Sequence, residues 1–582
     1  MNLKNIFTVS AAAFMLMGCQ PDLLDTKPYD SVASGNMWTS ENFADKGVNA
    51  IYSALRQSYT GLQPYNIEQL GVGADCRDQD SPILVNKVTT GTGVFSTYWT
   101  QQYRGISRAN DAIAHLGAIN MDETKKARYI AEAKVLRAYF YSRLNALYKG
   151  VPVYLEPIEA SECTKGQDSE AEVWNTVITD LTDAINEPNL PNMYSAGAAD
   201  YGHITKGAAY ALRGKAYLYI KDYAKAAADF EKVGECGYSL FQGGYKQLFK
   251  EANEQCSEMI FSVQCIGLSG LGNEISFRYG TRSSYGSCWN TYLVNTDFVE
   301  TYENADGSKF NWDDIIPGYN EMTPKARRVY FLRDGLTDDE KAKMAQDGAD
   351  MSKYLDEGNE ARIKKAYENR DPRLTASIIT PYSTYDGANG SNAYTYTLRW
   401  PYRGYDTAAP FDLKTDTNNR YYYLFRKFVA EGPSEIPNRS YSPIDVPIIR
   451  YADVLLNLAE CYNELNQTDK AVECVNKVRE RAGVALLNSN AATTVNGQSD
   501  LRERIRNERR WEFNGEGVDF YDEMRWGTWK EARFFEGAGL KQIWGEPQYT
   551  YTWSGDQVYT WPAPLGERQL NPNLKLADGW KD

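Results

Sequence analysis

Small and aromatic residues recur at helical spacing in two stretches that lie far apart in the chain. The first, "AAYALRGKAYLYIKDYAKAAADFEKV", spans residues 208–233, and the second, "DVLLNLAECYNELNQTDKAVECVNKV", spans 453–478. Each predicts two amphipathic helices in the pattern of a tetratricopeptide repeat, in which small residues let the helices approach closely and aromatic residues fill the space between hairpins. The matching positions are Tyr210, Gly214, Tyr217, Ala226 and Phe230, and then Leu455, Leu458, Ala459, Tyr462, Ala471 and Val475.

Two weaker copies of the pattern precede these stretches. "KVLRAYFYSRLNALY" repeats the Arg-small-x-x-Tyr spacing of the first hairpin from Arg137 onward. Its partner helix is expected to begin near Ser169, because Ser169 and Glu172 have the spacing of a capping box. An earlier pair is expected at 41–59 and 98–116. The predicted fold class is therefore mostly α: four tetratricopeptide-like helical hairpins form a scaffold, and the apolar stripes are its core.

Three long insertions differ in kind from the helical stretches. Residues 60–97, 265–320 and 380–445 are rich in Gly, Pro, Ser, Asn and Tyr and have little helical period. Loops of this length are uncommon unless they are functional or disordered, and their aromatic content argues against disorder. Residues 323–369 read as charged, exposed helices. We therefore expect a large irregular region with few short strands, packed on the helical scaffold.

The only long apolar run near the start of the chain ends in "LMGC". Residues 1–18 contain a basic residue, a short apolar stretch and a small residue, which is typical of a signal peptide, and the stretch is shorter than the ~20 residues of a spanning helix. "LMGC" also resembles a bacterial lipobox, which would make Cys19 the acylated N-terminus and tether the mature chain to a membrane. The alternative is an ordinary signal peptide followed by an incidental cysteine.

Composition restricts the class of partner. The chain has 582 residues and a net charge of −14, with 77 acidic and 63 basic side chains. Nucleic-acid-binding proteins need basic surfaces, so we expect no nucleic-acid partner. The 43 tyrosines and 13 tryptophans suggest binding surfaces, since sugars and peptides stack on large planar side chains.

The sequence offers few side chains for nucleophilic catalysis or zinc binding. Only His115 and His203 are present, which disfavours zinc and the Ser-His-Asp and Cys-His mechanisms. We therefore predict no metal and no cofactor. The even number of cysteines besides Cys19 permits disulfides in an exported chain. Cys461 and Cys474, however, fall at interior positions of predicted helices, where a free cysteine acts as a small hydrophobe.

Five features together resemble the SusD/RagB family of outer-membrane nutrient-binding lipoproteins. They are the lipobox cysteine, "RAYFYSRLNALYKGVPVY", "VPIIRYADVLLNLAECY", "RNERRWEFNGEGVDFYDEMRWG" and "WPAPLGERQLNPNL". The resemblance implies four tetratricopeptide-like hairpins, an irregular domain that holds the ligand site, and a position as a lid on a SusC-like TonB-dependent transporter. It also implies that the ligand is a glycan, or in some branches a peptide, and that a lipid at Cys19 anchors the protein to the outer membrane, facing the exterior.

These expectations divide the chain into five parts. They are a signal peptide (1–18), a lipidated N-terminal tether (19–40), a hairpin scaffold with loop insertions (41–260), an irregular ligand-binding region (261–445), and the last hairpin with a C-terminal segment (446–582).

One segment, "NERRWEFNGEGVDFYDEMRWG", crowds carboxylates and arginines together. Glu508, Glu512, Glu516 and Asp519 lie close together in it. Paired carboxylates perform glycoside hydrolysis, so a carboxylate-dependent hydrolase is one hypothesis. Glu508 and Glu512 are four residues apart on a predicted helix, however, and i,i+3 and i,i+4 ion pairs with the interleaved arginines explain the pattern as scaffold. We therefore predict that the protein is not an enzyme and that Asn514-Gly515 forms a turn between two short helices.

Two loops combine aromatic side chains with planar hydrogen-bonding groups. This mix suits sugars, whose C–H faces stack on rings while their hydroxyls bond to Arg and Asp. The family resemblance implies a site assembled from the same two regions. The candidates in the first loop are Asp75, Arg77, Asp78 and Trp99. The candidates in and after the second, "FRYGTRSSYGSCWNTY", are Arg278, Tyr279, Arg282, Tyr285, Trp289, Tyr292 and Trp312.

Each candidate has a structural alternative. Trp99 begins a predicted helix, and packing in a core explains it equally well. Tyr285 and Trp289 lie in a glycine- and serine-rich setting that gives less reason for burial. A third loop, "LRWPYRGYD", offers Trp400 and is explained as well by a transporter-facing surface.

Three functions follow from these patterns. The first is a surface receptor that binds a glycan and delivers it to a SusC-like transporter. The second is a peptide-binding lid of the same architecture, which would need a deeper polar groove and would show no affinity for sugars. The third is a carboxylate-dependent glycoside hydrolase, which the position of the acidic residues on predicted scaffold disfavours.

Overall fold

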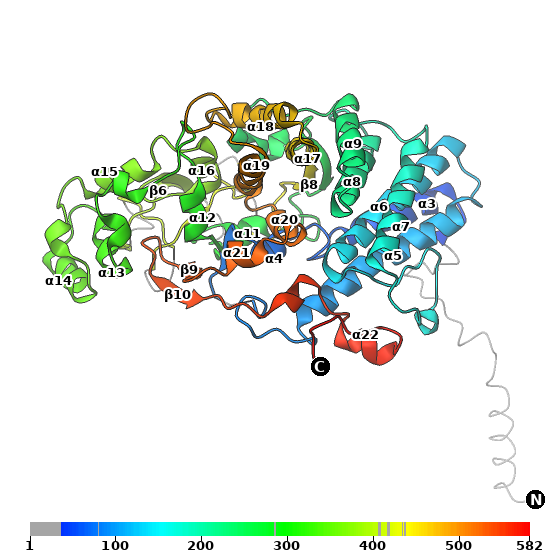
Figure 1. Ribbon diagram of the computed structural model, residues 1–582, viewed down its shortest axis with the longest axis horizontal. Helices are drawn as coiled ribbons and strands as arrows, with labels where there is room; N and C mark the ends of the chain where they lie inside the picture. Colours follow the sequence, from blue (N-terminus) through cyan, green and yellow to red (C-terminus); the bar gives the residue numbers. More distant parts are fainter. Residues whose placement is uncertain are drawn as a thin grey trace, which may run out of the picture.

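Long helices gather at one end of the molecule, and short helices, strands and loops form the other end (Figure 1). The computed structural model describes residues 37–78, 81–284, 287–390, 392–404, 409–415, 420–432, 435 and 438–582. The predicted fold class, mostly α with few short strands, is confirmed. Across the described ranges, no helix combines the length and the apolar character needed to span a membrane.

The scaffold consists of helices that pack in consecutive pairs. Helix α3 packs against α5, α6 against α7, α8 against α9, and α17 against α18, and α9 contacts α17, so the last pair continues the series. That these pairs are tetratricopeptide-like remains a prediction. The long helices are α3 (Glu41–Ala54), α5 (Gly93–Leu116), α6 (Glu123–Tyr148), α7 (Glu170–Asn186), α8 (Lys206–Tyr219), α9 (Tyr223–Glu235), α17 (Tyr451–Glu464), α18 (Thr468–Ala482) and α19 (Gln498–Phe513).

The arginines of two pairs bond to an aspartate on the following helix. Arg137 of α6 donates two hydrogen bonds to Asp180 of α7, at 2.8 and 2.7 Å. Arg213 of α8 donates two to Asp229 of α9, both at 2.7 Å. Bidentate pairs of this kind fix the relative orientation of two helices. Close approach also requires Gly214, because a Cβ there would lie 2.6 Å from the Phe230 ring.

Three local predictions are confirmed. Ser169 caps α7, and its hydroxyl and the Glu172 carboxylate form the reciprocal capping box. The predicted turn at Asn514-Gly515 is present between α19, which ends at Phe513, and α20 (Asp519–Trp526), although only α20 is the short helix expected. Cys461 and Cys474 are buried and free; the other cysteines among the residues described are also free, but only Cys265 and Cys288 of them are buried.

The irregular end is built from short elements that pair over long sequence distances. Strand β1 pairs antiparallel with β3, β2 with β8, β4 with β7, β5 with β6, and β9 with β10. The strands are β1 (Ala74–Cys76), β2 (Met259–Val263), β3 (Tyr292–Val294), β4 (Ile378–Ile379), β5 (Thr384–Asn389), β6 (Asn392–Thr397), β7 (Leu424–Phe425), β8 (Val446–Arg450), β9 (Gly539–Lys541) and β10 (Pro547–Thr550). The short helices are α4 (Tyr65–Glu68), α10 (Tyr245–Leu248), α11 (Ile275–Tyr279), α12 (Thr296–Thr301), α13 (Pro324–Arg327), α14 (Asp338–Gln346), α15 (Asn359–Lys364), α16 (Pro372–Ser377), α21 (Trp529–Arg533) and α22 (Leu565–Leu570).

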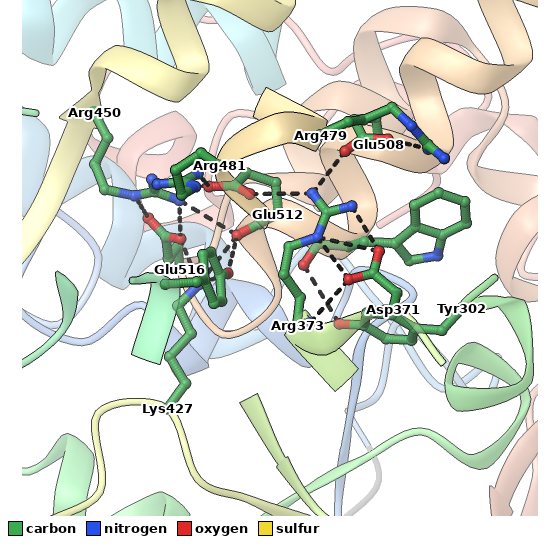
Figure 2. Close-up of polar contacts among 12 residues, drawn as sticks. Tyr302, Asp371, Arg373, Lys427, Arg450, Arg479, Arg481, Glu508, Glu512 and Glu516 are labelled. Atoms are coloured by element: carbon green, nitrogen blue, oxygen red, sulfur yellow. Dashed lines mark hydrogen bonds and ion pairs between the residues drawn. The ribbon is translucent and has the colours of Figure 1, made fainter. Parts of the chain in front are cut away.

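A network of buried charges joins the last long helices to the irregular end (Figure 2). Glu512 of α19 lies within ion-pair distance of three guanidinium groups, those of Arg373, Arg450 and Arg481. The side chains of all four residues are at most 2% exposed. Burial alone raises the pKa of Glu512, but the three guanidinium groups outweigh burial and lower the pKa to about 2. The carboxylate is therefore ionised at neutral pH and held from three directions.

The same network recruits segments from distant parts of the sequence. Its further pairs are Glu508 with Arg373 and Arg479, Glu516 with Arg450 and Lys427, Asp371 with Arg373, Glu258 with Arg450 and Arg481, and Glu303 with Arg479. Removing charges from water is costly unless each one is paired. The network is therefore favourable only when all of these segments are in place together.

The ion pairs of α19 differ in part from the sequence-based prediction. Pairs within the helix do occur, between Arg504 and Asp500 and between Arg506 and Glu503, but the prediction did not name them. It is wrong for Glu508 and Glu512, whose arginine partners come from other elements. Both carboxylates face the protein interior, so an arginine one turn away on the helix surface does not reach them.

The C-terminal segment returns beneath the scaffold, in red in Figure 1, and ends beside α5. Trp561 packs edge-to-face against Phe95 and Tyr98 of α5. Its backbone N–H donates to the carbonyl of Leu147 in α6 over 2.8 Å. The last residue, Asp582, accepts a hydrogen bond from Thr90 at 2.9 Å. The end of the chain thus completes the packing of helices near its start.

Replacing Glu512 with glutamine should destabilise the protein by about 3–5 kcal/mol, because it removes one charge from a buried network and leaves three guanidinium groups short of a partner. Urea unfolding followed by circular dichroism measures the change. The pKa of Glu512 is lower in the folded protein than in the unfolded chain, where it is about 4.3. Ionised Glu512 therefore contributes its full stabilisation above pH ~4.3, and this stabilisation is lost as the pH falls toward about 2. The matched control is Glu503→Gln on the same helix, where the carboxylate is 56% exposed and a change under about 0.5 kcal/mol is expected. Equal effects of the two substitutions would contradict this account of the network.

His203 should make stability depend on pH. Its Nδ1 lies 2.7 Å from the buried carboxylate of Glu132, which also accepts a hydrogen bond from Tyr52. Burial lowers the pKa of His203, but the hydrogen bond and charge of Glu132 outweigh burial and raise it. The pair of His203 with Glu132 therefore contributes its full stabilisation below pH ~6.5, which is the pKa of histidine in the unfolded chain. This stabilisation is lost as the pH rises through the higher pKa of His203 in the folded protein. The unfolding midpoint of His203→Gln, measured from pH 5 to 9, should fall less over this range than that of the wild type. An equal fall in the two proteins would contradict this account of His203.

Candidate functional site

Pairing of β1 with β3 brings the two candidate loops together. Asp75 pairs with Leu293 and Cys76 with Tyr292 in this antiparallel ladder. One residue further on, the backbone N–H of Arg77 donates to the carbonyl of Thr291 over 2.8 Å. Segments more than 200 residues apart in the sequence therefore meet in one surface, as the sequence predicted for the two regions.

An exposed tryptophan forms the centre of this surface. Trp289 is 44% exposed, although tryptophan is a residue that proteins usually bury. Its ring lies 4.8 Å from the ring of Phe277 at 51°, and its backbone N–H donates to the Phe277 carbonyl over 3.0 Å. Phe277 is itself 8% exposed, so it supports the indole ring from below. We call these two rings the aromatic platform.

Charged side chains surround the aromatic platform. The guanidinium of Arg278 lies 5.8 Å from the Trp289 ring centroid and pairs with Glu274 at 2.9 Å. The guanidinium of Arg439, which the sequence analysis did not single out, lies 5.0 Å from the Phe277 ring. Flat aromatic surface and planar charged donors thus occur side by side.

The Arg77–Asp78 pair contacts the chain at Trp289 and Asn290. Arg77 donates to the carbonyl of Trp289 at 2.9 Å and to the side chain of Asn290 at 2.8 Å, and it pairs with Asp78. The hydrogen bond from Arg77 lowers the pKa of Asp78, and the charges of Arg282 and Arg420 act in the same direction. Asp78 remains an ionised, exposed acceptor, since its side chain is 57% exposed.

Asp75 fixes the position of this loop and does not face solvent. Its carboxylate is fully buried and accepts hydrogen bonds from Arg533 at 2.9 Å, Tyr551 at 2.6 Å and Asn295 at 3.0 Å. Burial raises the pKa of Asp75, and the guanidinium of Arg533 opposes that shift. Asp75 therefore anchors β1 two residues before Arg77, and we do not keep it among the ligand contacts.

Four further candidates are buried in the described structure. Tyr279 is fully buried and stacks on Phe425 at 4.0 Å, and Tyr292 stacks on Tyr65 at 5.0 Å. Trp99, in α5, packs between Tyr103 and Tyr148, and Trp312 stacks on Tyr319 at 4.5 Å while its indole N–H donates to Glu300. Their exposed fractions are all 8% or less. The fold uses these rings as core, and Trp312 is not brought next to Trp289.

The remaining predicted residues lie at the surface or outside the described ranges. Arg282 is partly exposed near Asp78, whose pKa it lowers. Tyr285 and the predicted lipidation site Cys19 fall outside the residues that the structure describes. Trp400 in the third loop is 5% exposed and packs against Trp544 at 4.5 Å. The surface candidates brought together are thus Arg77, Asp78, Arg278, Arg282 and Trp289.

Sequence reasoning missed two contributors to the site. Phe277 immediately precedes Arg278 in the second loop, so its position next to the candidates was a usable signal. Arg439 comes from a loop about 150 residues away, and no spacing in the sequence relates it to Trp289.

The four acidic candidates of the α19–α20 segment are buried and held by ion pairs or backbone hydrogen bonds. Glu508 and Glu512 are fully buried, and Glu516 and Asp519 are 8% and 5% exposed. Glu508, Glu512 and Glu516 pair with buried basic groups, and Asp519 accepts hydrogen bonds from the backbone of Val72 and Gly73. In the part of the chain that the structure covers, no group of three or more His, Cys, Asp or Glu side chains is arranged to hold a metal ion. Among the candidates that the sequence named, the aromatic platform is therefore the exposed arrangement that combines an aromatic ring with charged groups.

Comparisons with known proteins agree with this architecture. Residues 257–580 match the sequence model of the SusD family, and residues 22–218 match a model described as starch-binding associating with outer membrane. SusD-like protein P25 from Formosa agariphila is 25% identical over 613 aligned residues, which cover 99% of each chain. A solved SusD-like carbohydrate-binding protein from Bacteroides fragilis has a TM-score of 0.69 and 25% identity, covering 93% of this chain and all of that one. A laminarin-binding SusD-like protein of known structure has a TM-score of 0.63 and 23% identity, with coverage of 93% and 100%. The SusD family model matches more than half of the length of this chain, and the chain therefore belongs to the SusD family.

Proposed function

We propose that this protein is a cell-surface lipoprotein that binds extracellular glycan chains and delivers them to a SusC-like TonB-dependent transporter in the outer membrane. It is anchored through a lipid on Cys19 and faces the exterior. The glycan binds on the aromatic platform and bonds to the charged groups around it.

The exposure of Trp289 is the observation that carries the proposal. A sugar ring has an apolar C–H face that stacks on an indole, and hydroxyl groups at its edge that bond to guanidinium and carboxylate groups. Trp289 supplies the flat ring on which the C–H face stacks, and Arg77, Asp78 and Arg278 supply the groups that bond to the hydroxyls. The named carbohydrate-binding relative supports the same ligand class.

The burial of the acidic residues favours binding over hydrolysis. A glycosidase needs two carboxyl groups that reach the sugar, one of them with a proton to give. Glu512 has a pKa lowered to about 2 and is enclosed by arginines, so it neither donates a proton at neutral pH nor meets a substrate. We therefore propose a receptor without catalytic activity.

A glycan-binding panel tests the proposed function. The protein used is the mature chain, residues 19–582, with Cys19→Ser to prevent acylation. We expect at least one polysaccharide among starch, laminarin, fructan, xylan, mannan, pectin and mucin-type chains to bind, with no product released. If the protein binds peptides and none of the glycans, its function is that of a peptide-binding lid and not that of a glycan receptor. Release of a product from any glycan would indicate a hydrolase. Recovery of a TonB-dependent transporter with the protein from detergent-solubilised outer membranes tests the partner.

Substituting Trp289 with alanine should weaken glycan binding about tenfold or more, as expected for a central aromatic anchor. It should change the free energy of unfolding by less than about 1 kcal/mol, since the ring is nearly half exposed. Isothermal titration and thermal unfolding measure the two effects. Trp312→Ala is the control for a buried indole and should destabilise by about 3–5 kcal/mol. A comparable loss of stability in Trp289→Ala would assign Trp289 to the core.

A further inference from the structure

A pocket of about 110 Å³ lies where the helical scaffold meets the irregular end, apart from the aromatic platform. Its lining comes from α6, α7 and α8 on the scaffold side and from β8 and α20 on the other, and neither Phe277 nor Trp289 belongs to it. We propose that this pocket binds a small organic carboxylate, whose charged end is held by Arg143 of α6 and Trp174 of α7. The inference is independent of glycan binding.

Arg143 brings a positive charge to this pocket with no carboxylate beside it. Among the described residues, its guanidinium has no hydrogen-bond or ion-pair partner, and its Nε is buried. Its contacts are aromatic instead, since the guanidinium carbon lies 4.0 Å from the ring centroid of Tyr521 and 5.9 Å from that of Tyr139. Aromatic rings attract a cation, but its five N–H donors need oxygen acceptors.

Other buried arginines of the chain have the oxygen acceptors that Arg143 lacks. Arg450, Arg479 and Arg509 each pair with at least two carboxylates. Arg370 donates instead to backbone carbonyls, among them those of Ala366 at 3.1 Å and Tyr302 at 2.6 Å. Burying a charge is costly unless it is paired and hydrogen-bonded. An acceptor that comes from solution is therefore expected at Arg143.

A second donor lines the same pocket from the neighbouring helix. Trp174 is 1% exposed, and its indole Nε1 has no hydrogen-bond acceptor in the part of the chain that the structure describes. Its ring stacks on Tyr219 at 4.6 Å, and Tyr219 belongs to the lining as well. Buried indole N–H groups normally have a partner. A carboxylate has two oxygens and can accept from the guanidinium and the indole together.

The rest of the lining restricts the ligand to one charge and a small apolar body. The other charged side chains of the lining are all paired, and they are Lys215, Glu516, Asp522 and Arg525. Leu212, Ile448 and Ile449 add apolar surface. The volume is a few times the ~30 Å³ that one water occupies in the liquid, which suits an acid with a short aliphatic chain and excludes a glycan chain.

The test compares short carboxylates with their uncharged amides. The mature chain with Cys19→Ser is titrated calorimetrically with acetate, propionate and butyrate, and with acetamide, propionamide and butyramide, at constant ionic strength. We expect at least one acid to bind with one-to-one stoichiometry and its amide to bind about tenfold more weakly or not at all, because a charge-assisted hydrogen bond is lost. Equal binding of acid and amide, or binding of none of the acids, would overturn the inference.

Two substitutions assign the contact to its donors. Arg143→Met removes the cation but keeps an unbranched side chain, and it should weaken binding of the acid about tenfold or more. Trp174→Phe removes the N–H but keeps an aromatic ring, and it should weaken binding about fivefold. The matched control is Arg506→Met, which changes an arginine 5.1 Å from the ring of Trp526 and should leave binding unaltered. Circular dichroism establishes that each variant is folded.

A crystal structure with saturating carboxylate gives a readout that needs no variant. Density for the acid between Arg143 and Trp174 would support the inference, and water alone at this place would contradict it. Wild-type affinity in either Arg143→Met or Trp174→Phe would also contradict the two-donor site. These results leave the proposed glycan binding untouched, because neither ring of the aromatic platform lines the pocket.

Discussion

The rest of the structure depends on the buried charge network around Glu512, in which each carboxylate is paired with basic side chains. Glu512 is enclosed by three guanidinium groups that come from β8, α18 and α16, elements of both the scaffold and the irregular end (Figure 2). Such an arrangement resists small displacements, because moving any one segment leaves an uncompensated charge in a medium of low polarity. The network thereby fixes how the helical scaffold meets the irregular end that carries the aromatic platform.

The effect reaches the site through backbone contacts. The turn after α19 presents the N–H groups of Gly515 and Gly517 to the buried carboxylate of Glu68, at 2.8 and 2.7 Å. Asp519, just beyond that turn, accepts hydrogen bonds from the backbone of Val72 at 2.8 Å and Gly73 at 3.2 Å. These bonds hold the chain immediately before β1, and β1 in turn aligns the two loops that carry the platform and its charged neighbours.

Whether a feature of the structure could be predicted from the sequence depended on how far apart in the chain its residues lie. Local features were predictable: the helix pairs follow from spacing, the cap at Ser169 from two residues three apart, and the turn at Asn514 from a dipeptide. Whether an aromatic ring is exposed was not predictable in the same way. Trp312 and Trp289 both lie in loop-rich sequence, yet the folded chain buries Trp312 and leaves Trp289 exposed. The glycine- and serine-rich setting of Trp289 was nevertheless a correct guide to its exposure.

Partners distant in the chain were the part that the sequence could not supply. The carboxylates of α19 have arginines one turn away, and helix periodicity alone pairs them with those. Their actual partners depend on which side of the helix faces the interior, and this is decided by elements from outside the segment. Likewise, Arg439 reaches the aromatic platform only because the loop that carries it folds over α11.

The contact between Glu68 and the α19–α20 turn has a consequence for the order in which the fold assembles. Its two bonded pairs are 447 and 449 residues apart in the chain. Closing a loop of this length costs conformational entropy before the contact forms, whereas helix pairs such as α6 with α7 close over short stretches. Strand β1 and the loop that follows it are therefore expected to become ordered only after the far end of the chain has docked, so the proposed ligand-binding surface is expected to be among the last parts of the molecule to form.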